Sequence, residues 1–153
     1  MIELPEVVTI ARQIRSEFVG KRIEAVSIAE ERPKFMFLNE DLDAYEGNVC
    51  GIGNGYLQDI LFRAKLSPKR KVPDISPDER MRLRGAIAET MTEAIEKGGR
   101  DTERDLYGRP GRYVPILDRR AVDTPCPDCG TPIEKMSYLG GSCYVCPSCQ
   151  PAP

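Results

Sequence analysis

Four cysteines near the end of the chain have the types and the spacing of a metal site. Cys126 and Cys129 form one Cys-x-x-Cys pair, and sixteen residues separate it from a second pair, Cys146 and Cys149. Two such pairs place four thiolates around one zinc ion in a tetrahedron. Because four thiolates leave no open position on the metal, the pattern predicts one structural zinc that folds a small ribbon. Two redox dithiols or disulfides are the alternative interpretation.

A glycine-rich segment has the features of an anion-binding loop. Residues 51–55 read Gly-Ile-Gly-Asn-Gly and precede an expected helix. Backbone N–H groups at a helix N-terminus are ready donors for a phosphate, and Asn54 would add a side-chain amide. We therefore expect Gly53, Asn54 and Gly55 to bind nucleic-acid phosphates. An ordinary turn before a helix is the alternative.

A basic run follows the same expected helix. Residues 63–71 contain five bases and no acid, and four of the bases are further candidates for nucleic-acid binding: Lys65, Lys69, Arg70 and Lys71. A run of this kind is also typical of a solvated surface loop. Its place between the glycine-rich segment and the zinc-binding segment favours phosphate contacts.

Bulk composition sets limits on the class of protein. The chain has 153 residues and a formal net charge of −2, which allows one ordinary domain or two or three small ones. No run of about 18 apolar residues exists, so we expect no membrane span. Acids near the N-terminus are not typical of a signal peptide, so a cytoplasmic location is expected. Because disulfides are rare in the cytoplasm, the two remaining cysteines, Cys50 and Cys143, are interpreted as small buried residues.

Helices and a small ribbon must position these groups. A first helix is expected to begin near Pro5 and to end at Gly20, and a third is expected to begin with the capping sequence Ser-Pro-Asp-Glu at 76–79 and to end at 98–99. The other expected elements are strands at 22–28 and 34–38, a second helix at 56–65, a short helix at 101–106 and a two-hairpin ribbon at the metal site.

Three segments together resemble one family, the formamidopyrimidine-DNA glycosylases and endonuclease VIII. Residues 51–68 resemble its helix–two-turn–helix signature, which residues 98–102 close. Residues 126–133 and 146–150 resemble its C-terminal zinc finger. Residues 3–7, Glu-Leu-Pro-Glu-Val, resemble its N-terminal catalytic segment, and the opening Met-Ile-Glu-Leu-Pro-Glu resembles a divergent branch.

The resemblance implies an α+β, mainly α fold in three parts. Residues 1–49 would be a remnant of the catalytic domain, residues 50–118 a helix–two-turn–helix nucleic-acid-binding domain, and residues 119–153 a zinc ribbon. The partner implied is duplex DNA, damaged or abasic, and the location is the cytoplasm in association with the nucleoid. Asn54 matches the asparagine with which the family binds phosphates next to the lesion.

The resemblance also implies base-excision chemistry. In this family an N-terminal proline amine attacks C1′ of a flipped nucleotide and forms a Schiff base, and a glutamate moves protons. Carried over to this chain, the amine is that of Met1, and Glu3 and Glu6 are the proton-handling carboxylates. For both acids, capping of a helix N-terminus is the alternative role.

Four departures from the family pattern bear on activity. Ile2 stands where the family has its catalytic proline, and Gly140-Gly141 stands where it has Gly-Arg. The family's tyrosine before the finger has no counterpart at residues 118–120, and only about thirty residues separate Gly20 from Cys50, where the family has a β-sandwich. We interpret the chain as a damaged-DNA-binding protein with impaired or lost chemistry. An active bifunctional glycosylase/lyase and a non-functional, internally deleted remnant are the alternatives.

Overall fold

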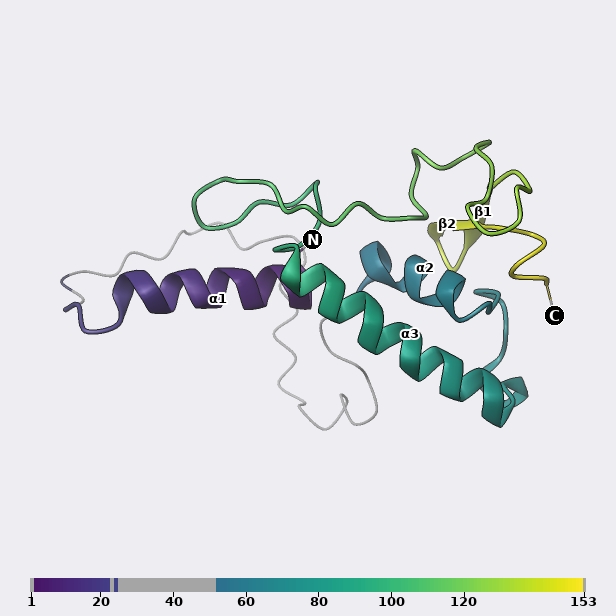
Figure 1. Cartoon of the computed structure of the whole chain (residues 1–153), viewed down its shortest axis with the longest axis horizontal. Helices are drawn as coiled ribbons and strands as arrows, with labels where there is room; N and C mark the ends of the chain where they lie inside the picture. The colour runs from purple at the N-terminus through teal and green to yellow at the C-terminus, as the bar shows by residue number, and fades with distance from the viewer. Residues whose placement is uncertain (1, 23, 25–51, 153) are drawn as a thin grey trace.

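The computed structural model describes residues 2–22, 24 and 52–152 (Figure 1). Within these ranges it contains three α-helices, one turn of 3-10 helix and one two-stranded sheet. The elements are α1 (Leu4–Phe18), α2 (Asn54–Arg63), η2 (Val72–Asp74), α3 (Pro77–Glu96), β1 (Glu134–Tyr138) and β2 (Gly141–Val145). The expected α+β, mainly α architecture is confirmed. The strands expected at 22–28 and 34–38 lie almost wholly outside the described residues.

The helices form a chain of contacts from one end of the molecule to the other. Figure 1 shows α1 at one end, the β1–β2 hairpin at the opposite end, and α2 and α3 between them. α3 contacts both α1 and α2, and α2 contacts β2. Helix α2 therefore joins the metal-binding ribbon to the rest of the protein. No helix in the described part of the chain is long and apolar enough to cross a membrane.

α1 is buried at its beginning and exposed along its length. Glu3, Pro5 and Glu6 are buried, whereas the apolar side chains of Val7, Ile14 and Phe18, which follow the helical period, are 44–56% exposed. The expected helix is thus confirmed, and Gly20 ends it with a φ of 86°. Besides the first turn, Gln13 and Glu17 form hydrogen bonds with residues 105–107, so the contacts that position α1 are polar.

α2 begins and ends two residues earlier than expected from the sequence. Gly53 is its N-cap, and Lys65 adopts a φ of 58°, a left-handed conformation that does not continue a helix. The helix packs on α3 on one side and on the ribbon on another. For that reason Tyr56, Asp59 and Phe62 are all buried, although they do not lie on a single apolar stripe.

α3 follows its sequence signals closely. Ser76 Oγ accepts a hydrogen bond from the Glu79 backbone N–H at 3.3 Å, and Glu79 Oε2 accepts one from the Ser76 N–H at 2.8 Å. This capping box starts the helix, whose first residue is the expected N1 proline, Pro77. The prediction of a short helix at 101–106 is wrong. The segment forms turns instead, because residues 100 and 104 bridge back to Tyr113 and Pro110.

Two apolar clusters share α2. The first lies between α2 and α3 and contains Tyr56, Ile60, Ala64, Leu66, Ala86, Met91, Ala94 and Tyr113. The second lies between α2 and the ribbon and contains Phe62, Leu117, Cys126, Ile133 and Cys146. Because Cys126 and Cys146 belong to the second cluster, the ribbon is packed on α2 and does not hang free.

Asp59 fastens the connector between α3 and the ribbon to α2. Its carboxylate is fully buried and accepts hydrogen bonds from the Tyr113 hydroxyl at 2.7 Å and from the backbone N–H groups of Ile116 and Leu117 at 2.9 and 2.8 Å. Burial raises the pKa of Asp59, and these hydrogen bonds offset part of the rise. The connector is thereby fixed at residues 113–117.

The ribbon has one paired hairpin instead of the two expected. β1 and β2 are antiparallel, with Met136 opposite Cys143 and Tyr138 opposite Gly141. Leu139 and Gly140 form the turn with φ values of 48° and 78°. The first cysteine pair sits in a turn closed by a single bridge between Pro125 and Pro132, which is too short to be a strand pair.

Candidate functional site

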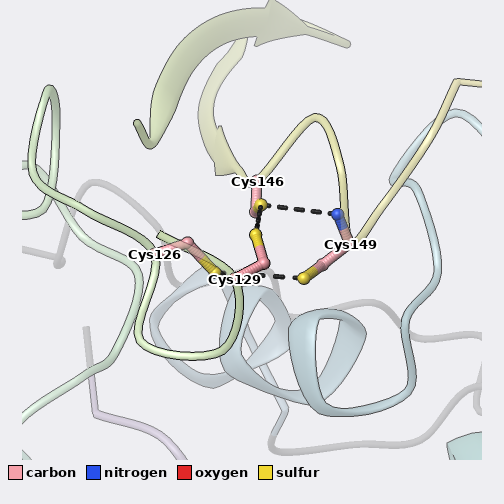
Figure 2. A group of neighbouring side chains, drawn as sticks. All are labelled: Cys126, Cys129, Cys146 and Cys149. Carbon is pink, nitrogen blue, oxygen red and sulfur yellow. Dashed lines mark hydrogen bonds between the residues drawn. The ribbon is translucent and has the colours of Figure 1, made fainter. Parts of the chain in front are cut away.

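The four predicted metal ligands converge on one point (Figure 2). All four Sγ atoms lie within 4.8 Å of one another. Cys129 and Cys146 are 3.4 Å apart and Cys126 and Cys149 are 3.9 Å apart, sulfur to sulfur. Zn–S bonds of about 2.3 Å require sulfur–sulfur edges of about 3.8 Å in a tetrahedron, whereas a disulfide requires about 2.05 Å. The set fits one structural zinc ion and does not fit disulfides.

Gln150 attaches the second cysteine pair to the end of α2. Its Oε1 accepts a hydrogen bond from the Cys146 N–H at 3.1 Å, and its Nε2 donates one to the Leu66 carbonyl at 2.9 Å. The side chain is only 3% exposed. In addition, the Cys149 N–H donates to Cys146 Sγ at 3.4 Å, a hydrogen bond that offsets part of the rise that burial causes in the pKa of Cys146. Sequence reasoning missed Gln150, whose only signal is its place after the last cysteine.

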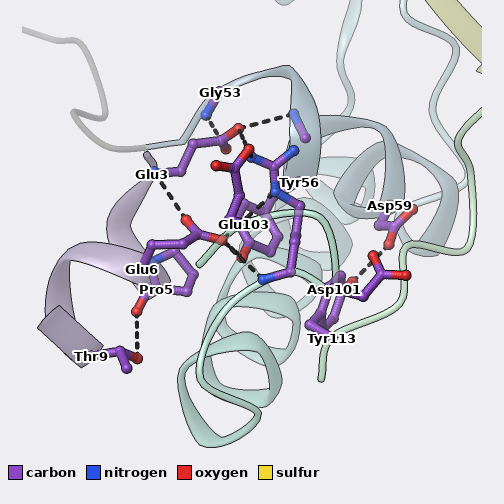
Figure 3. Close-up of polar contacts among 12 residues, drawn as sticks. Glu3, Pro5, Glu6, Thr9, Gly53, Tyr56, Asp59, Asp101, Glu103 and Tyr113 are labelled. Atoms are coloured by element: carbon purple, nitrogen blue, oxygen red, sulfur yellow. Dashed lines mark hydrogen bonds and ion pairs between the residues drawn. The ribbon is translucent and has the colours of Figure 1, made fainter. Parts of the chain in front are cut away.

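The glycine-rich loop binds a carboxylate of the chain itself. The N–H groups of Gly53 and Gly55 donate to Glu3 Oε2 and Oε1 at 2.7 and 3.1 Å (Figure 3). A Cβ on Gly55 would overlap the Arg100 guanidinium and lie 2.7 Å from Glu3 Oε1, so glycine is needed for this approach. The loop does bind an anion at a helix N-terminus, as expected, but these two amides are not open to a phosphate. Gly51 lies outside the described residues.

Glu6 completes the junction between α1 and α2. Its Oε1 accepts hydrogen bonds from the Tyr56 hydroxyl at 2.5 Å and the Arg100 N–H at 3.0 Å, and its Oε2 accepts one from the Glu3 N–H at 2.9 Å (Figure 3). Burial by itself raises the pKa of Glu6, but these hydrogen bonds outweigh burial and leave the pKa below its usual value. Glu6 is therefore an ionised structural acceptor near neutral pH.

Arg100 is the cation that faces the two buried glutamates, and it also pairs with Glu103 at 3.2 Å. Its Nη2 lies 3.4 Å from Glu3 Oε1, its Nε lies 3.7 Å from Glu6 Oε1, and its guanidinium is 5.3 Å from the centre of the Tyr56 ring. Burial, followed by the hydrogen bond to Glu6, raises the pKa of Tyr56 and keeps its hydroxyl protonated as a donor. Sequence reasoning missed both Arg100 and Tyr56, because their partners lie about fifty to ninety residues away along the chain.

Asn54 and Gln58 join the first turns of α2 to the ribbon. Asn54 Nδ2 donates to the Ser142 carbonyl at 3.3 Å, and Gln58 Oε1 accepts from the Tyr144 N–H at 2.7 Å. Asn54 nevertheless remains exposed. It lines an open cavity of about 370 Å³ whose wall also includes Glu3 and Tyr144. Among the phosphate-binding groups predicted in residues 53–55, the N–H groups of Gly53 and Gly55 are bound to Glu3, whereas the Asn54 side chain is exposed beside this cavity.

The basic run is partly neutralised within the protein. Lys65 pairs with Asp128, and Arg70 Nη2 lies 3.2 Å from Glu79 Oε1. Lys69 and Lys71 are exposed and have no ion pair with any residue that the structure describes. These two lysines therefore offer the run's available positive charge. All four bases remain predicted nucleic-acid contacts, but Lys65 and Arg70 are already paired with acids of the protein.

Three further residues singled out from the sequence remain, of which two lie outside the described part. Met1, the predicted nucleophile, and Cys50 belong to the residues that the structure leaves undescribed. Cys143 is half-buried, not buried as expected, because it lines an open apolar groove between α2 and the hairpin. Burial raises the pKa of its thiol. Cys143 takes no part in the metal cluster.

Comparison with known proteins shows where the likeness lies. Residues 42–105 match the model of the formamidopyrimidine-DNA glycosylase H2TH domain. Formamidopyrimidine-DNA glycosylase of Geotalea daltonii is 40% identical over 107 residues, which cover 67% of this chain and 39% of that protein. The enzyme of a Synechococcus strain is 39% identical over 141 residues, covering 88% of this chain and 47% of the relative. The chain spans less than half the length of these relatives.

Solved structures give the same result for the fold. The MutM (Fpg) protein of Thermus thermophilus superposes with a TM-score of 0.62 at 36% identity, over 66% of this chain and 40% of the other. Lactococcus lactis Fpg in complex with abasic-site DNA gives a TM-score of 0.62 at 27% identity, over 67% of this chain and 39% of the other. With the matched helix–two-turn–helix domain and the four-cysteine cluster that follows it, the chain belongs to the formamidopyrimidine-DNA glycosylase/endonuclease VIII family.

Proposed function

We propose that this protein binds duplex DNA containing damaged or abasic sites, and that its glycosylase chemistry is impaired or lost. The observation that carries the proposal is Asn54, which is exposed on the first turn of α2 and hydrogen-bonded to the adjoining ribbon. Relatives with this arrangement of helix and ribbon have been solved with DNA that carries 8-oxo-G or an abasic site. Lys69 and Lys71 add positive charge to the binding surface.

The engagement of the two glutamates supports impaired chemistry. Glu3 is held by two backbone amides and Arg100, and Glu6 accepts three hydrogen bonds. Both residues act as ties between α1 and α2. The position of the family's proline nucleophile holds Ile2, an aliphatic side chain that is 56% exposed. Zinc, when bound by the four cysteines, would supply folding energy to the ribbon and take no part in bond cleavage.

DNA binding is tested by titrating an abasic-site duplex at several salt concentrations. Each phosphate contact contributes about 0.9 to the slope of log affinity against log salt. We expect Asn54→Ala and Lys69→Ala to weaken binding and Lys69→Ala to reduce that slope. Arg84→Ala, which removes an exposed charge from α3, is the matched control. Unchanged affinity in both test variants would contradict the proposed surface, and absent binding by the wild type would favour the remnant interpretation.

A second candidate is an abasic-site lyase, because the Glu3 carboxylate also lines the cavity beside Asn54. In such a lyase an amine of the chain would attack C1′ of the abasic sugar, and the resulting adduct would lose water to form an imine. Borohydride reduces that imine and leaves a covalent protein–DNA adduct. An adduct that is lost in Glu3→Gln would establish this activity, whereas binding without any adduct would leave the DNA-binding function alone.

A further inference from the structure

The cavity next to Asn54 contains a cation that the described contacts do not use. Arg119 lies on the connector that precedes the ribbon and lines the same cavity of about 370 Å³ as Asn54. It is exposed, and its guanidinium has no hydrogen bond or ion pair with any residue in the described ranges. An unpaired guanidinium on a cavity wall is suited to bind an anionic group from outside the protein.

The neighbouring arginine has a different role. Arg120 Nη1 lies 2.5 Å from Asp101 Oδ2, and its Nη2 lies 2.6 Å from Asp118 Oδ2. These ion pairs raise the pKa of Arg120, the hydrogen bonds to Asp101 and Asp118 being the main causes. Arg120 is thus held by two carboxylates and fixes the connector, while Arg119 is left to the cavity.

The backbone that carries Arg119 is fixed on both sides. Two residues before it, the Leu117 N–H donates to the buried Asp59 at 2.8 Å. Directly after it, the Arg120 N–H donates to Asp118 Oδ1 at 2.7 Å, and the Ala121 N–H donates to the Asp118 carbonyl at 3.0 Å. A guanidinium on an ordered backbone loses less freedom on binding than one on a loose loop.

The two acids on the cavity wall are engaged by donors other than Arg119. Glu3 accepts from the glycine amides and lies against Arg100, which also faces Glu6 and Glu103, and Asp118 pairs with Arg120, which also pairs with Asp101. The positive charge of Arg119 has no such partner among the described residues, and the exposed amide of Asn54 lies on the same cavity. A phosphate can accept hydrogen bonds from both groups.

The cysteine turns and the hairpin, residues 126–150, contain no arginine. Gly141 and Asn54 line a second groove, between α2 and the hairpin, and a Cβ on Gly141 would meet only the Tyr138 carbonyl oxygen at 3.6 Å. The hairpin therefore has room for a side chain but carries none at this point. We propose that Arg119, from the connector, provides the guanidinium that binds the DNA phosphate contacted by Asn54. This inference rests on the proposed DNA-binding function.

The test measures the affinity of the full chain for an abasic-site duplex across a salt series. We expect Arg119→Ala to bind about tenfold more weakly, the size of one charge-assisted contact, with a salt slope shallower by about 0.9. Arg119→Lys should keep the slope and lose part of the affinity, because the ammonium lacks the bidentate fork. Arg84→Ala should match the wild type. Equal zinc content and melting temperature verify that each variant is folded.

A double-mutant cycle tests whether both residues serve the same phosphate. If they do, Asn54→Ala combined with Arg119→Ala weakens binding by clearly less than the product of the single effects. Fully independent effects would overturn the shared phosphate, and an unchanged affinity and slope in Arg119→Ala would overturn the role of Arg119, while leaving DNA binding intact. A wild-type chain without salt-dependent binding would instead overturn the proposed function, and this inference with it.

Discussion

Replacing Glu6 by glutamine tests whether the carboxylate is a structural tie. Glu6 is 3% exposed and accepts hydrogen bonds from Tyr56, Arg100 and Glu3, with the Arg100 guanidinium alongside. Glutamine presents one oxygen and one NH₂ group, so at least one buried donor loses its acceptor. An unsatisfied buried group costs about 1–3 kcal/mol, and hydrogen bonds to a charged group contribute about 1.5–3 kcal/mol. We expect the free energy of unfolding to fall by about 3 kcal/mol.

The pH dependence gives the sharper measurement. Because the folded state lowers the pKa of Glu6 from 4.5, the stabilisation is fully present above the unfolded pKa and is lost as the pH falls through the folded value. Urea unfolding from pH 7 to pH 3 should show a wild-type advantage over Glu6→Gln that is constant near neutral pH and shrinks in acid. Glu17→Gln is the control, because this carboxylate lies on the same helix but is exposed and accepts only one described hydrogen bond, from the Tyr107 hydroxyl at 2.7 Å. Parallel pH profiles for wild type and Glu6→Gln, with a loss no larger than that of Glu17→Gln, would refute the reasoning.

Three further outcomes are expected. Gly55→Ala should lower the melting temperature measured by calorimetry, because the added Cβ would overlap Arg100. Gly85→Ala, which has open space around it in the middle of α3, should instead raise the stability by up to about 1 kcal/mol. Cys126→Ser should release zinc and unfold the ribbon, as seen by metal analysis and circular dichroism, while Cys143→Ser should do neither; a folded, zinc-free ribbon would contradict the metal site. Gly141→Arg should increase DNA affinity several-fold at low salt, and an unchanged affinity would place the DNA away from the hairpin.

Sequence patterns predicted the local features well. The Cys-x-x-Cys spacing predicted the cluster of four thiols, since one turn of chain brings each pair together. The Ser-Pro-Asp-Glu sequence located the start of α3, because a capping box involves only residues 76–79. The glycines at 53 and 55 indicated free donors at a helix N-terminus, although in the structure their N–H groups bind Glu3 and not the expected phosphate. In the first two cases the signal and the structure depend on residues close together in the chain.

The remaining features depend on contacts between distant residues. Nothing in the spacing of Glu3 and Gly53, fifty residues apart, shows that the loop binds an internal carboxylate. The pairing of Lys65 with Asp128 is equally non-local, so the run's available charge was overestimated. Asp59 is fully buried, although helical periodicity alone would assign this polar residue to a solvent-facing position. Partners, rather than residue types, decide these roles.

Under the proposed function, the packing of the ribbon on α2 would make zinc supply a determinant of DNA affinity. Asn54 is joined to the hairpin through the Ser142 carbonyl, and Phe62 shares an apolar cluster with two of the cysteines. Removal of the metal would loosen the wall against which the asparagine is oriented. If the protein binds DNA as proposed, zinc shortage would weaken that binding before the helices melt. Titration with a chelator should therefore reduce binding at concentrations that leave the helical content unchanged.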